Sequence, residues 1–314
     1  MSNLIFSLNA TLPVFFTMIL GWFFKKTALM DDHFVEKTNK FVFRAALPVL
    51  LFEDLASVDF IEVWDTSFVL FCFFATLLSV LGVTAVSFLL KDKSIQGEFI
   101  QASYRSSAAI LGIAFIQNIY GNAGMGPLMI IGTVPLYNIC AVVVLSFMKP
   151  DRKKLDKRLL KETLLEIVTN PIILGIVAGM IWSVLRIPML PILGKTVKNL
   201  SALATPLGLM AMGASFEMKD VSACLKPAVL ASFIKLVGLA AVFLPIAINL
   251  GFRTEKLVAI LVMLGTATTV SCYIMARNMG HKGVLTSNTV MLTTLFSAFT
   301  LTGWLFLLRT MGFI

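Results

Sequence analysis

A single arginine lies inside a long apolar stretch of this chain, among small and polar residues. The stretch runs from Glu98 to Gly121 and reads EFIQASYRSSAAILGIAFIQNIYG, with Arg105 as its one cation. A guanidinium, hydroxyls and amides at membrane depth are tolerated only where protein or a water-filled cavity receives them. The stretch is therefore a candidate site for a carboxylate, which a guanidinium can bind with two parallel hydrogen bonds.

Arg105 also has a second interpretation. Its side chain could extend to the membrane surface, because Lys93, a little earlier in the chain, belongs to a short polar loop. Lys235 lies midway along a later apolar run. It could contact a substrate, or it could instead bind a structural partner or extend to the membrane surface. Arg44 lies nearer the end of its run and is interpreted as a surface anchor.

A second stretch has the same character about 158 positions later. It runs from Glu255 to Gly280 and reads EKLVAILVMLGTATTVSCYIMARNMG. Two interrupted apolar stretches at matching places in two halves of a chain are typical of a transporter's binding site. Both carry polar clusters: Ser106, Ser107, Gln117 and Asn118 on the first, and Thr266, Thr268, Thr269, Ser271 and Asn278 on the second.

We expect both stretches to be helices that break near Gly112 and Val270. A broken helix has free backbone N–H groups at its new N-terminus, and such an end attracts an anion without a dedicated lysine. The alternative is that the hydroxyls only permit close packing and bond to their own helix. Tyr137 and Asn138 place a further amide in an apolar run, where it needs a partner or a cavity.

The composition indicates an integral membrane protein. Of the 314 residues, 58% are hydrophobic and 14% charged, with a mean hydropathy of +0.91, whereas a soluble domain carries roughly 25% charged residues. The first apolar run, 4–24, is too long for a cleavable signal peptide and has no basic residues before it. The four cysteines lie in apolar sequence without CxxC spacing, so we expect neither disulfides nor a metal site.

Other classes of function have little support. The net charge of +9 comes from basic residues in short loops, which favours a topology signal over nucleic-acid binding. The chain has no GxxxxGK[ST] motif, and His33 and His281 have no HExxH pattern. We therefore expect no ATP-driven motor, no enzyme and no cofactor.

Apolar runs long enough to cross the hydrocarbon core, about 20 residues each, predict ten transmembrane helices. They cover residues 4–24, 39–57, 66–90, 99–120, 126–148, 171–186, 197–216, 227–250, 257–279 and 284–308. The basic segment 149–170 divides them into a first five-helix repeat, 1–148, and a second, 171–314. The predicted fold class is an all-α membrane protein built as a 5+5 inverted repeat, with broken fourth and ninth helices that cross.

The distribution of positive charge predicts the orientation. With the 149–170 connector in the cytoplasm, 17 of the 26 lysines and arginines fall on that side and six fall outside. Short loops rich in positive charge mark the cytoplasmic face. Five helices before an inside connector place both termini outside. The carboxylates Glu53 and Asp54, at the outer end of the second helix, are interpreted as interfacial rather than as a proton relay.

Cysteine labelling tests this orientation. We expect Lys154→Cys to be shielded from an impermeant thiol reagent in intact cells, because the bilayer separates the connector from the medium. We expect Asp59→Cys, in the acidic loop after the second helix, to be labelled. The unmodified chain, with its four apolar cysteines, is the control, and the reverse pattern would overturn the orientation.

The two halves of the chain also resemble one another. ALPVLLFEDLASVDF, residues 46–60, aligns with ATPLGLMAMGASFEM, residues 204–218, so that Pro48 matches Pro206. A proline inside a helix frees a carbonyl and bends the helix. Such a pair either lines a cavity or only bends the scaffold. A repeat with an odd number of helices enters the membrane from the opposite face, so the repeat is inverted.

At the two interrupted stretches the chain resembles the auxin efflux carrier family. Residues 112–116, GIAFI, running to Tyr120-Gly121, resemble the fourth-helix motif GIPLL followed by YG, and residues 268–277, TTVSCYIMAR, look like the ninth-helix segment of bacterial members. The resemblance covers the whole chain in helix number, central basic loop and length. The chain differs in having Ala114 in place of the crossover proline and Ser107 nearest the family's asparagine.

The resemblance implies a scaffold and a transport domain, elevator-type alternating access, and an anion site where the broken helices cross. The bacterial branch is described as malate or malonate permeases. The substrate site so predicted consists of Arg105, Ser106, Ser107, Gly112, Ile113, Ala114, Gln117, Asn118, Tyr137, Asn138, Thr268, Thr269, Val270, Ser271 and Cys272.

The expected partners are a small organic anion, membrane lipid and a second copy in a homodimer, with no nucleic acid. The expected place is the bacterial inner membrane, and the expected driving force is the membrane potential or a proton gradient. One alternative is a sodium-coupled organic-anion symporter of the bile-acid-carrier type. Another is a membrane receptor or scaffold that binds its ligand without moving it.

Overall fold

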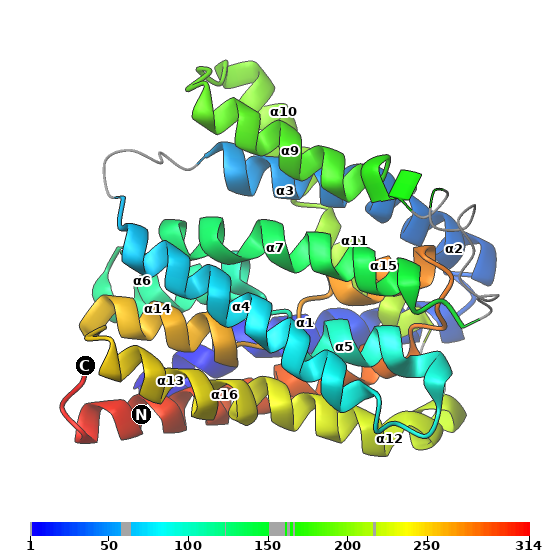
Figure 1. Cartoon of the computed structure of the whole chain (residues 1–314). Coiled ribbons are helices and arrows are strands. Elements are labelled where there is room, and N and C mark those ends of the chain that lie inside the picture. Colours follow the sequence, from blue (N-terminus) through cyan, green and yellow to red (C-terminus); the bar gives the residue numbers. More distant parts are fainter. Residues whose placement is uncertain are drawn as a thin grey trace.

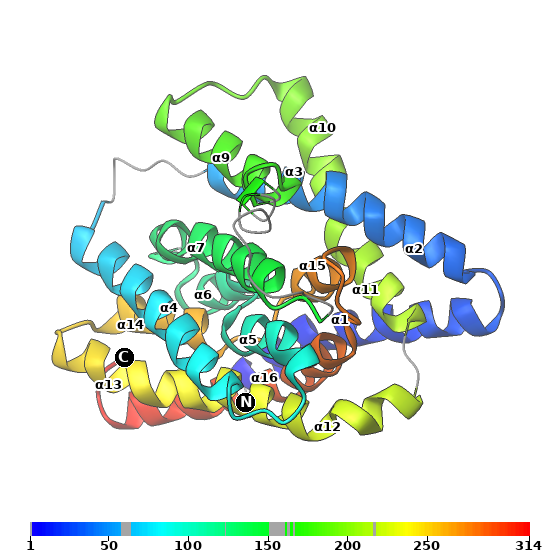
Figure 2. The same cartoon turned by 45° about the vertical axis from the view of Figure 1, so that its right-hand side comes forward.

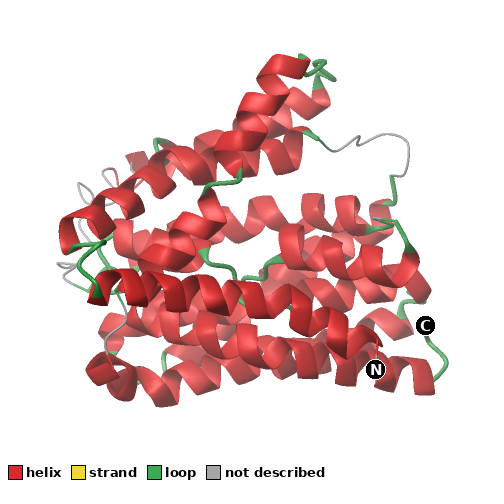
Figure 3. Ribbon diagram, turned by 180° about the vertical axis from the view of Figure 1, so that it is seen from behind, coloured by secondary structure: helices red, strands yellow, loops and turns green. Residues whose placement is uncertain are grey.

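The computed structural model describes residues 2–57, 64–122, 124–150, 161, 164, 165, 167–215 and 218–314. All regular structure in these residues is helical, and they contain no strand (Figure 3). Helices suit an apolar sequence of this kind, because a helix satisfies its own backbone polar groups where a bilayer cannot. The prediction of an all-α chain is therefore confirmed for the part of the chain that is described.

Helices occupy each of the predicted ranges, although several are interrupted. Four described stretches are long and apolar enough to cross a membrane by themselves: α4 (Thr66–Ser87), α7 (Gly126–Phe147), Cys224–Asn249 and α16 (Val284–Thr310). The sixth range contains a shorter apolar helix, α9 (Pro171–Val184). The number of crossings and the inverted repeat thus stay predictions.

One group of helices, which we call the frame, lies along one side of the molecule (Figures 1 and 2). Its members are α1 (Ser2–Lys26), α2 (Asp32–Phe41), η1 (Val42–Ala46), α3 (Leu47–Ala56), α9, α10 (Pro191–Ser201) and α11 (Ala204–Ala214). Within it α3 packs along α9 and α1 packs along α11.

The backbones of α1 and α11 touch. A Cβ added at Gly21 would lie 2.1 Å from the Met210 carbonyl oxygen, and one added at Gly213 would lie 2.0 Å from the Met18 carbonyl oxygen. Glycine is the residue that allows two helix backbones to approach so closely. Any larger residue at these positions would force the two helices apart.

The remaining helices form a second group, which we call the crossing group. Its members are α4, α5 (Gln96–Tyr104), η3 (Ala108–Gly112), α6 (Ile113–Tyr120), α7, α12 (Met218–Phe233), η4 (Ile234–Gly238), α13 (Leu239–Asn249), α14 (Thr254–Gly265), α15 (Ser271–Asn278) and α16. Helix α4 packs on α7 and α12 on α16, while α1 packs on α16 and joins the two groups. The centre of this group is α14, whose residues 257–265 are all buried.

The segments η1, η3 and η4 are π-helical. Such turns occur mostly as short insertions within α-helices, frequently beside functional sites. Here η3 follows the break in the first interrupted stretch directly, and η4 carries Lys235. The short 3₁₀ segment η2 (Lys93–Ile95) precedes α5.

Both termini lie at the same end of the molecule, near the start of α14 (Figures 1 and 3). The α1–α2 turn, η2 and the α15–α16 turn lie at the opposite end. With both termini at one end, the chain would cross the membrane an even number of times. Which end of the molecule faces the cytoplasm stays a prediction. Most of the expected basic connector, including Lys154, and the loop with Asp59 lie outside the described residues.

Candidate functional site

The first interrupted stretch breaks at residues 105–107. Helix α5 ends at Tyr104, and Arg105 is extended, with φ −75° and ψ 130°. The expected break near Gly112 is wrong, because Gly112 N–H donates to the Ser107 carbonyl at 3.0 Å inside the π-helix η3, which leads into α6. The break comes earlier because Ser106 and Ser107 bond to the second stretch instead of their own helix.

The second stretch breaks at residues 266–270, between α14 and α15, so the expected break near Val270 is confirmed. Hydrogen bonds join the two stretches at their breaks. Ser107 N–H donates to Ala267 O at 2.9 Å, Thr268 Oγ1 to Ala102 O at 2.8 Å and Gln101 Nε2 to Cys272 O at 2.9 Å, and Ser106 Oγ donates to Met263 O. Groups freed by each break are thus satisfied by the other stretch, as buried backbone requires.

The Arg105 side chain is buried where the two breaks meet, with 2% of its surface exposed. Its Nη2 donates to Asn138 Oδ1 at 2.7 Å and to Ser271 Oγ at 2.9 Å. Its Nη1 lies 2.9 Å from Met275 Sδ and 3.4 Å from Gln101 Oε1. This placement excludes the interpretation in which the side chain extends to the membrane surface.

All of these partners are neutral. No described carboxylate forms an ion pair with Arg105, and its buried Nε has no hydrogen-bond partner. A buried charge without a counter-charge is strongly unfavourable. The guanidinium therefore has a charge that an anion entering beside it can neutralise, and its Nε is a donor without a partner.

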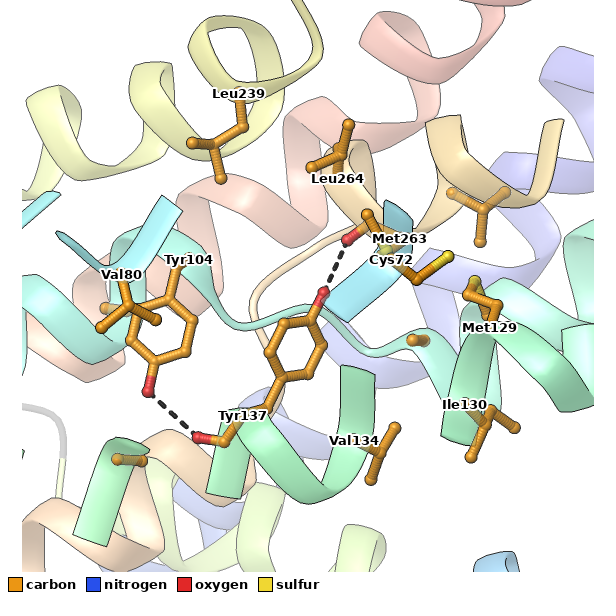
Figure 4. Packing of buried hydrophobic residues seen from close by; sticks show 14 of the residues in the cluster. Cys72, Val80, Tyr104, Met129, Ile130, Val134, Tyr137, Leu239, Met263 and Leu264 are labelled. Carbon is orange, nitrogen blue, oxygen red and sulfur yellow. Dashed lines mark hydrogen bonds between the residues drawn. The ribbon is translucent and has the colours of Figure 1, made fainter. Parts of the chain in front are cut away.

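Two tyrosines fix α7 to the crossing (Figure 4). The Tyr104 hydroxyl donates to the Tyr137 carbonyl at 3.0 Å, and the Tyr137 hydroxyl donates to the Met263 carbonyl at 3.0 Å. Met263 lies in the last turn of α14, whose carbonyls have no partner within their own helix. Tyr137 thereby positions the neighbouring Asn138 against Arg105.

A cavity of about 90 Å³ opens beside Arg105. The crossing group lines it with both breaks and α7, and the frame lines it with one face of α3, from Leu47 to Asp54, and with the start of α11 at Thr205. It therefore lies between the two groups of helices. Water-accessible space next to a buried guanidinium makes this the candidate binding site.

The structure gathers nine of the predicted site residues around this cavity: Arg105, Ser106, Ser107, Tyr137, Asn138, Thr268, Thr269, Val270 and Ser271. Six others lie away from its lining: Gly112, Ile113, Ala114, Gln117, Asn118 and Cys272. Gln117 and Asn118 are exposed farther along α6, and Cys272 is buried with Sγ toward the Gln101 carbonyl. For the five residues of the first stretch the displacement follows from its break, which precedes the expected one by more than a turn.

Sequence reasoning missed several residues of the site. Gln101 and Met275 contact Arg105 from the α-helices on either side of the breaks, and Asp54 of α3 lines the cavity. The frame residues of the lining cluster beside Pro48 and Pro206, which the sequence marked only as a matched pair. That pair was the available signal for this wall of the cavity.

Lys235 belongs to the structure of the crossing. It is fully buried in η4, and its Nζ donates to the carbonyl of Leu264 near the end of α14. It thus satisfies another carbonyl at the second break. Of its interpretations, the structural partner is the one that this geometry supports.

Glu98 is a buried carboxylate that sequence reasoning left without a role. It accepts hydrogen bonds from Gly283 N–H at 2.8 Å, from Thr286 N–H at 3.0 Å and from the Thr286 hydroxyl at 3.1 Å. These groups form the N-terminus of α16, where a negative charge is stabilising. Glu98 therefore ties the start of α5 to the turn between α15 and α16.

A family model described as a membrane transport protein matches residues 6–305, nearly the whole chain. This chain belongs to the auxin efflux carrier family. The family resemblance read from the interrupted stretches is thereby confirmed, while the bacterial branch stays a prediction. None of the curated proteins compared with the chain matches it.

As a member of the auxin efflux carrier family, the protein is a membrane transporter embedded in a lipid bilayer. A transporter needs a binding site enclosed by protein within the membrane, reached by moving parts. The cavity beside Arg105 meets the first requirement, because it lies between the frame and the crossing group.

Proposed function

We propose that this protein is a secondary carrier of a small organic anion such as malate or malonate. The observation that carries the proposal is Arg105, a buried guanidinium at the crossing of two broken helices with no described carboxylate paired to it. In a medium of low dielectric an arriving carboxylate gains strongly from this charge. Asn138 and Ser271 hold the planar group so that it faces the ligand in a fixed orientation.

The size of the cavity supports a small substrate. A single water molecule needs roughly 10–15 Å³ of space on the same measure. A cavity of about 90 Å³ therefore has room for roughly six to nine atoms of that size. Malonate or malate is of this size, whereas a bile acid is several times larger. The lining supplies the hydroxyls of Ser107 and Thr269 beside the guanidinium, which suits the free oxygens of a dicarboxylate.

The position of the cavity supports alternating access of the elevator type. All the hydrogen-bonding partners of Arg105 belong to the crossing group, while the frame supplies an opposite wall from α3 and α11. Movement of the crossing group along the frame would carry the site from one membrane face to the other. The ten crossings, the inverted repeat and the scaffold and transport domains of the sequence prediction are part of this proposal.

Coupling to the membrane potential or to protons fits this site better than coupling to sodium. A guanidinium beside the substrate repels a second cation at short range. Sodium sites are usually built from a carboxylate or several converging oxygens, and the described residues contain no cluster of three or more His, Cys, Asp and Glu side chains. The sodium-coupled symporter remains the second candidate because of the hydroxyls at both breaks.

The cellular setting is proposed from the sequence and the exposed surface. We place the protein in a bacterial inner membrane with both termini outside the cytoplasm. Helix α9 of the frame exposes apolar side chains, with Leu174 at 55% and Ile181 at 52% exposure. Lipid or the frame of a second copy in a homodimer would cover this face.

Reconstituted liposomes test the function. Uptake of labelled malonate and malate is measured with an imposed membrane potential, a pH gradient and a sodium gradient in turn. We expect uptake that follows the potential or the pH gradient. Uptake that requires sodium would select the symporter, and ligand binding without uptake would select a receptor.

Substituting Asn138 with aspartate tests the role of Arg105 with almost no change of shape. The new carboxylate would lie where Asn138 Oδ1 accepts from Arg105 at 2.7 Å, and it would neutralise the guanidinium internally. We expect anion binding to weaken by roughly 30-fold, because an internal ion pair must be broken before substrate binds. The measurement is the dissociation constant for malonate by calorimetry.

The matched control is Asn138→Ala, which removes the amide without adding a charge. It should weaken binding by only about fivefold, because the guanidinium keeps its charge and loses one of the hydrogen-bond partners that orient it. Equal effects of the two substitutions would show that the charge of Arg105 does not attract the substrate.

A further inference from the structure

A second cavity, of about 480 Å³, lies at the end of the molecule where the α1–α2 turn meets the α15–α16 turn. The frame lines one side of it with Trp22, Lys25, Lys26, Asp32 and Ser215, and the crossing group lines the other. None of its lining residues belongs to the cavity beside Arg105. It is thus a separate space, on the side that the sequence predicts to be cytoplasmic.

Positive charge dominates this cavity. Its lining includes four cations, Lys25, Lys26, Arg277 and Lys282, and one carboxylate, Asp32, which pairs with Lys25. The other three cations form no ion pair with a described carboxylate. Like charges around one space repel each other, so an anion between them is favoured.

A buried hydroxyl also points to a ligand. Tyr273 is 2% exposed and lines the cavity, and its hydroxyl has no partner within hydrogen-bond distance among the described residues, although the side chains of Ser215 and Asn39 lie near enough to interact with it. Buried polar groups in native proteins are almost always satisfied. An anion with several acceptor oxygens would accept from this hydroxyl while it binds the cations.

The local backbone holds Arg277 at the edge of the cavity. Its Nη1 donates to the Lys282 carbonyl at 3.0 Å. Gly283 has a φ of +77°, and a Cβ there would lie 2.8 Å from Arg277 Cδ. The left-handed turn and the missing side chain therefore make room for this arginine, which is suited to bidentate binding of a phosphate.

The surroundings indicate a lipid as the source of that anion. Trp22 lies at the end of α1 with Lys26 Nζ 4.3 Å from its ring centroid, an aromatic and basic pair of the kind found where a membrane meets water. Phe23, next to it in the chain, and Leu29, in the turn after α1, are 51% and 69% exposed and could receive acyl chains. Basic pockets between helices on the cytoplasmic side bind the head groups of anionic lipids.

We propose that this cavity binds the phosphate group of an anionic membrane lipid. The ligand would contact Lys26 on the frame and Arg277 and Lys282 on the crossing group. Because these residues belong to both groups, the bound lipid stabilises the arrangement of the two groups seen here. Anionic lipid is therefore a regulator of the transporter that acts away from its substrate site.

Thermal unfolding in detergent tests the proposal with three additives: phosphatidylglycerol, phosphatidylcholine and inorganic phosphate. At about 100 times its dissociation constant, phosphatidylglycerol should raise the Tm of the unmodified protein by roughly 5 °C or more. Phosphatidylcholine should not. An equal rise with inorganic phosphate alone would overturn the assignment to a lipid.

The double variant Arg277→Gln/Lys282→Gln should lose most of the rise in Tm caused by phosphatidylglycerol. The control Lys198→Gln, which replaces an exposed lysine of α10, should keep that rise. If the double variant does not fold, Tyr273→Phe tests the same site, because it removes one oxygen from a buried ring. The proposal would be overturned if phosphatidylglycerol raised the Tm of both the double variant and Tyr273→Phe as much as it raises the Tm of the unmodified protein.

Discussion

Replacing Arg105 with alanine is expected to weaken binding of malonate by roughly 30-fold or more, the effect of removing one member of a buried, hydrogen-bonded charge pair. The side chain supplies the charge at the crossing and a spare Nε donor. Arg105→Lys keeps the charge but loses the planar fork, so it should recover only part of the affinity. Calorimetry on purified protein measures the dissociation constants.

The matched control is Arg44→Ala, since Arg44 also lies in a predicted span but is exposed on η1. It should leave binding unchanged. Arg105→Ala also removes the donor to Asn138 Oδ1 and Ser271 Oγ, so gel filtration must show that the variant is folded. Folded Arg105→Ala with unchanged affinity would remove this residue from the substrate site.

Replacing Gly112 with leucine is expected to abolish transport. A Cβ at Gly112 would lie 2.6 Å from Val262 Cγ1 of α14, and the rest of the leucine side chain has no space. The substitution would push η3 away from α14, the helix that carries the second break. Overpacking of this kind costs roughly 1–3 kcal/mol, and the displaced helices no longer hold the cavity in shape.

Gly82→Leu serves as the control, because Gly82 lies inside α4 with nothing within 4 Å of an added Cβ. Both variants are reconstituted at equal amounts of folded protein, and malonate uptake is compared. We expect normal uptake with Gly82→Leu. Normal uptake with Gly112→Leu would show that close contact between the two broken stretches is not needed for transport.

The sequence predicted which helices are interrupted but not where the first one breaks. Gly112 was the natural breaking point by conformational preference. In the structure the break is at Arg105–Ser107, where backbone and hydroxyl groups bond to residues more than 150 positions away. A break decided by such distant partners cannot be read from local preference, and the five predicted site residues between Gly112 and Asn118 lie outside the cavity for this reason.

The burial of Arg105 was equally open at the level of sequence. The side chain could be buried at a substrate site or extend to the membrane surface. Burial depends on neutral acceptors around the guanidinium, and Asn138 and Ser271 supply them from α7 and α15. By contrast, residues 268–271 all line the cavity, because they follow one another in a single break. Sequence identifies polar groups in apolar runs, and only the packing of helices decides which of them share a cavity.

The bonds that hold the crossing together have a thermodynamic consequence. Glu98, Gln101, Ser107 and Thr268 link the two broken stretches to each other and to α16, and Arg105 finds all its partners inside the same group of helices. In the proposed carrier the ligand would therefore meet nearly the same contacts at either membrane face. A ligand with equal affinity for two states shifts neither, so substrate binding should not favour either orientation of the carrier, which should exchange internal for external anion as readily as it imports it.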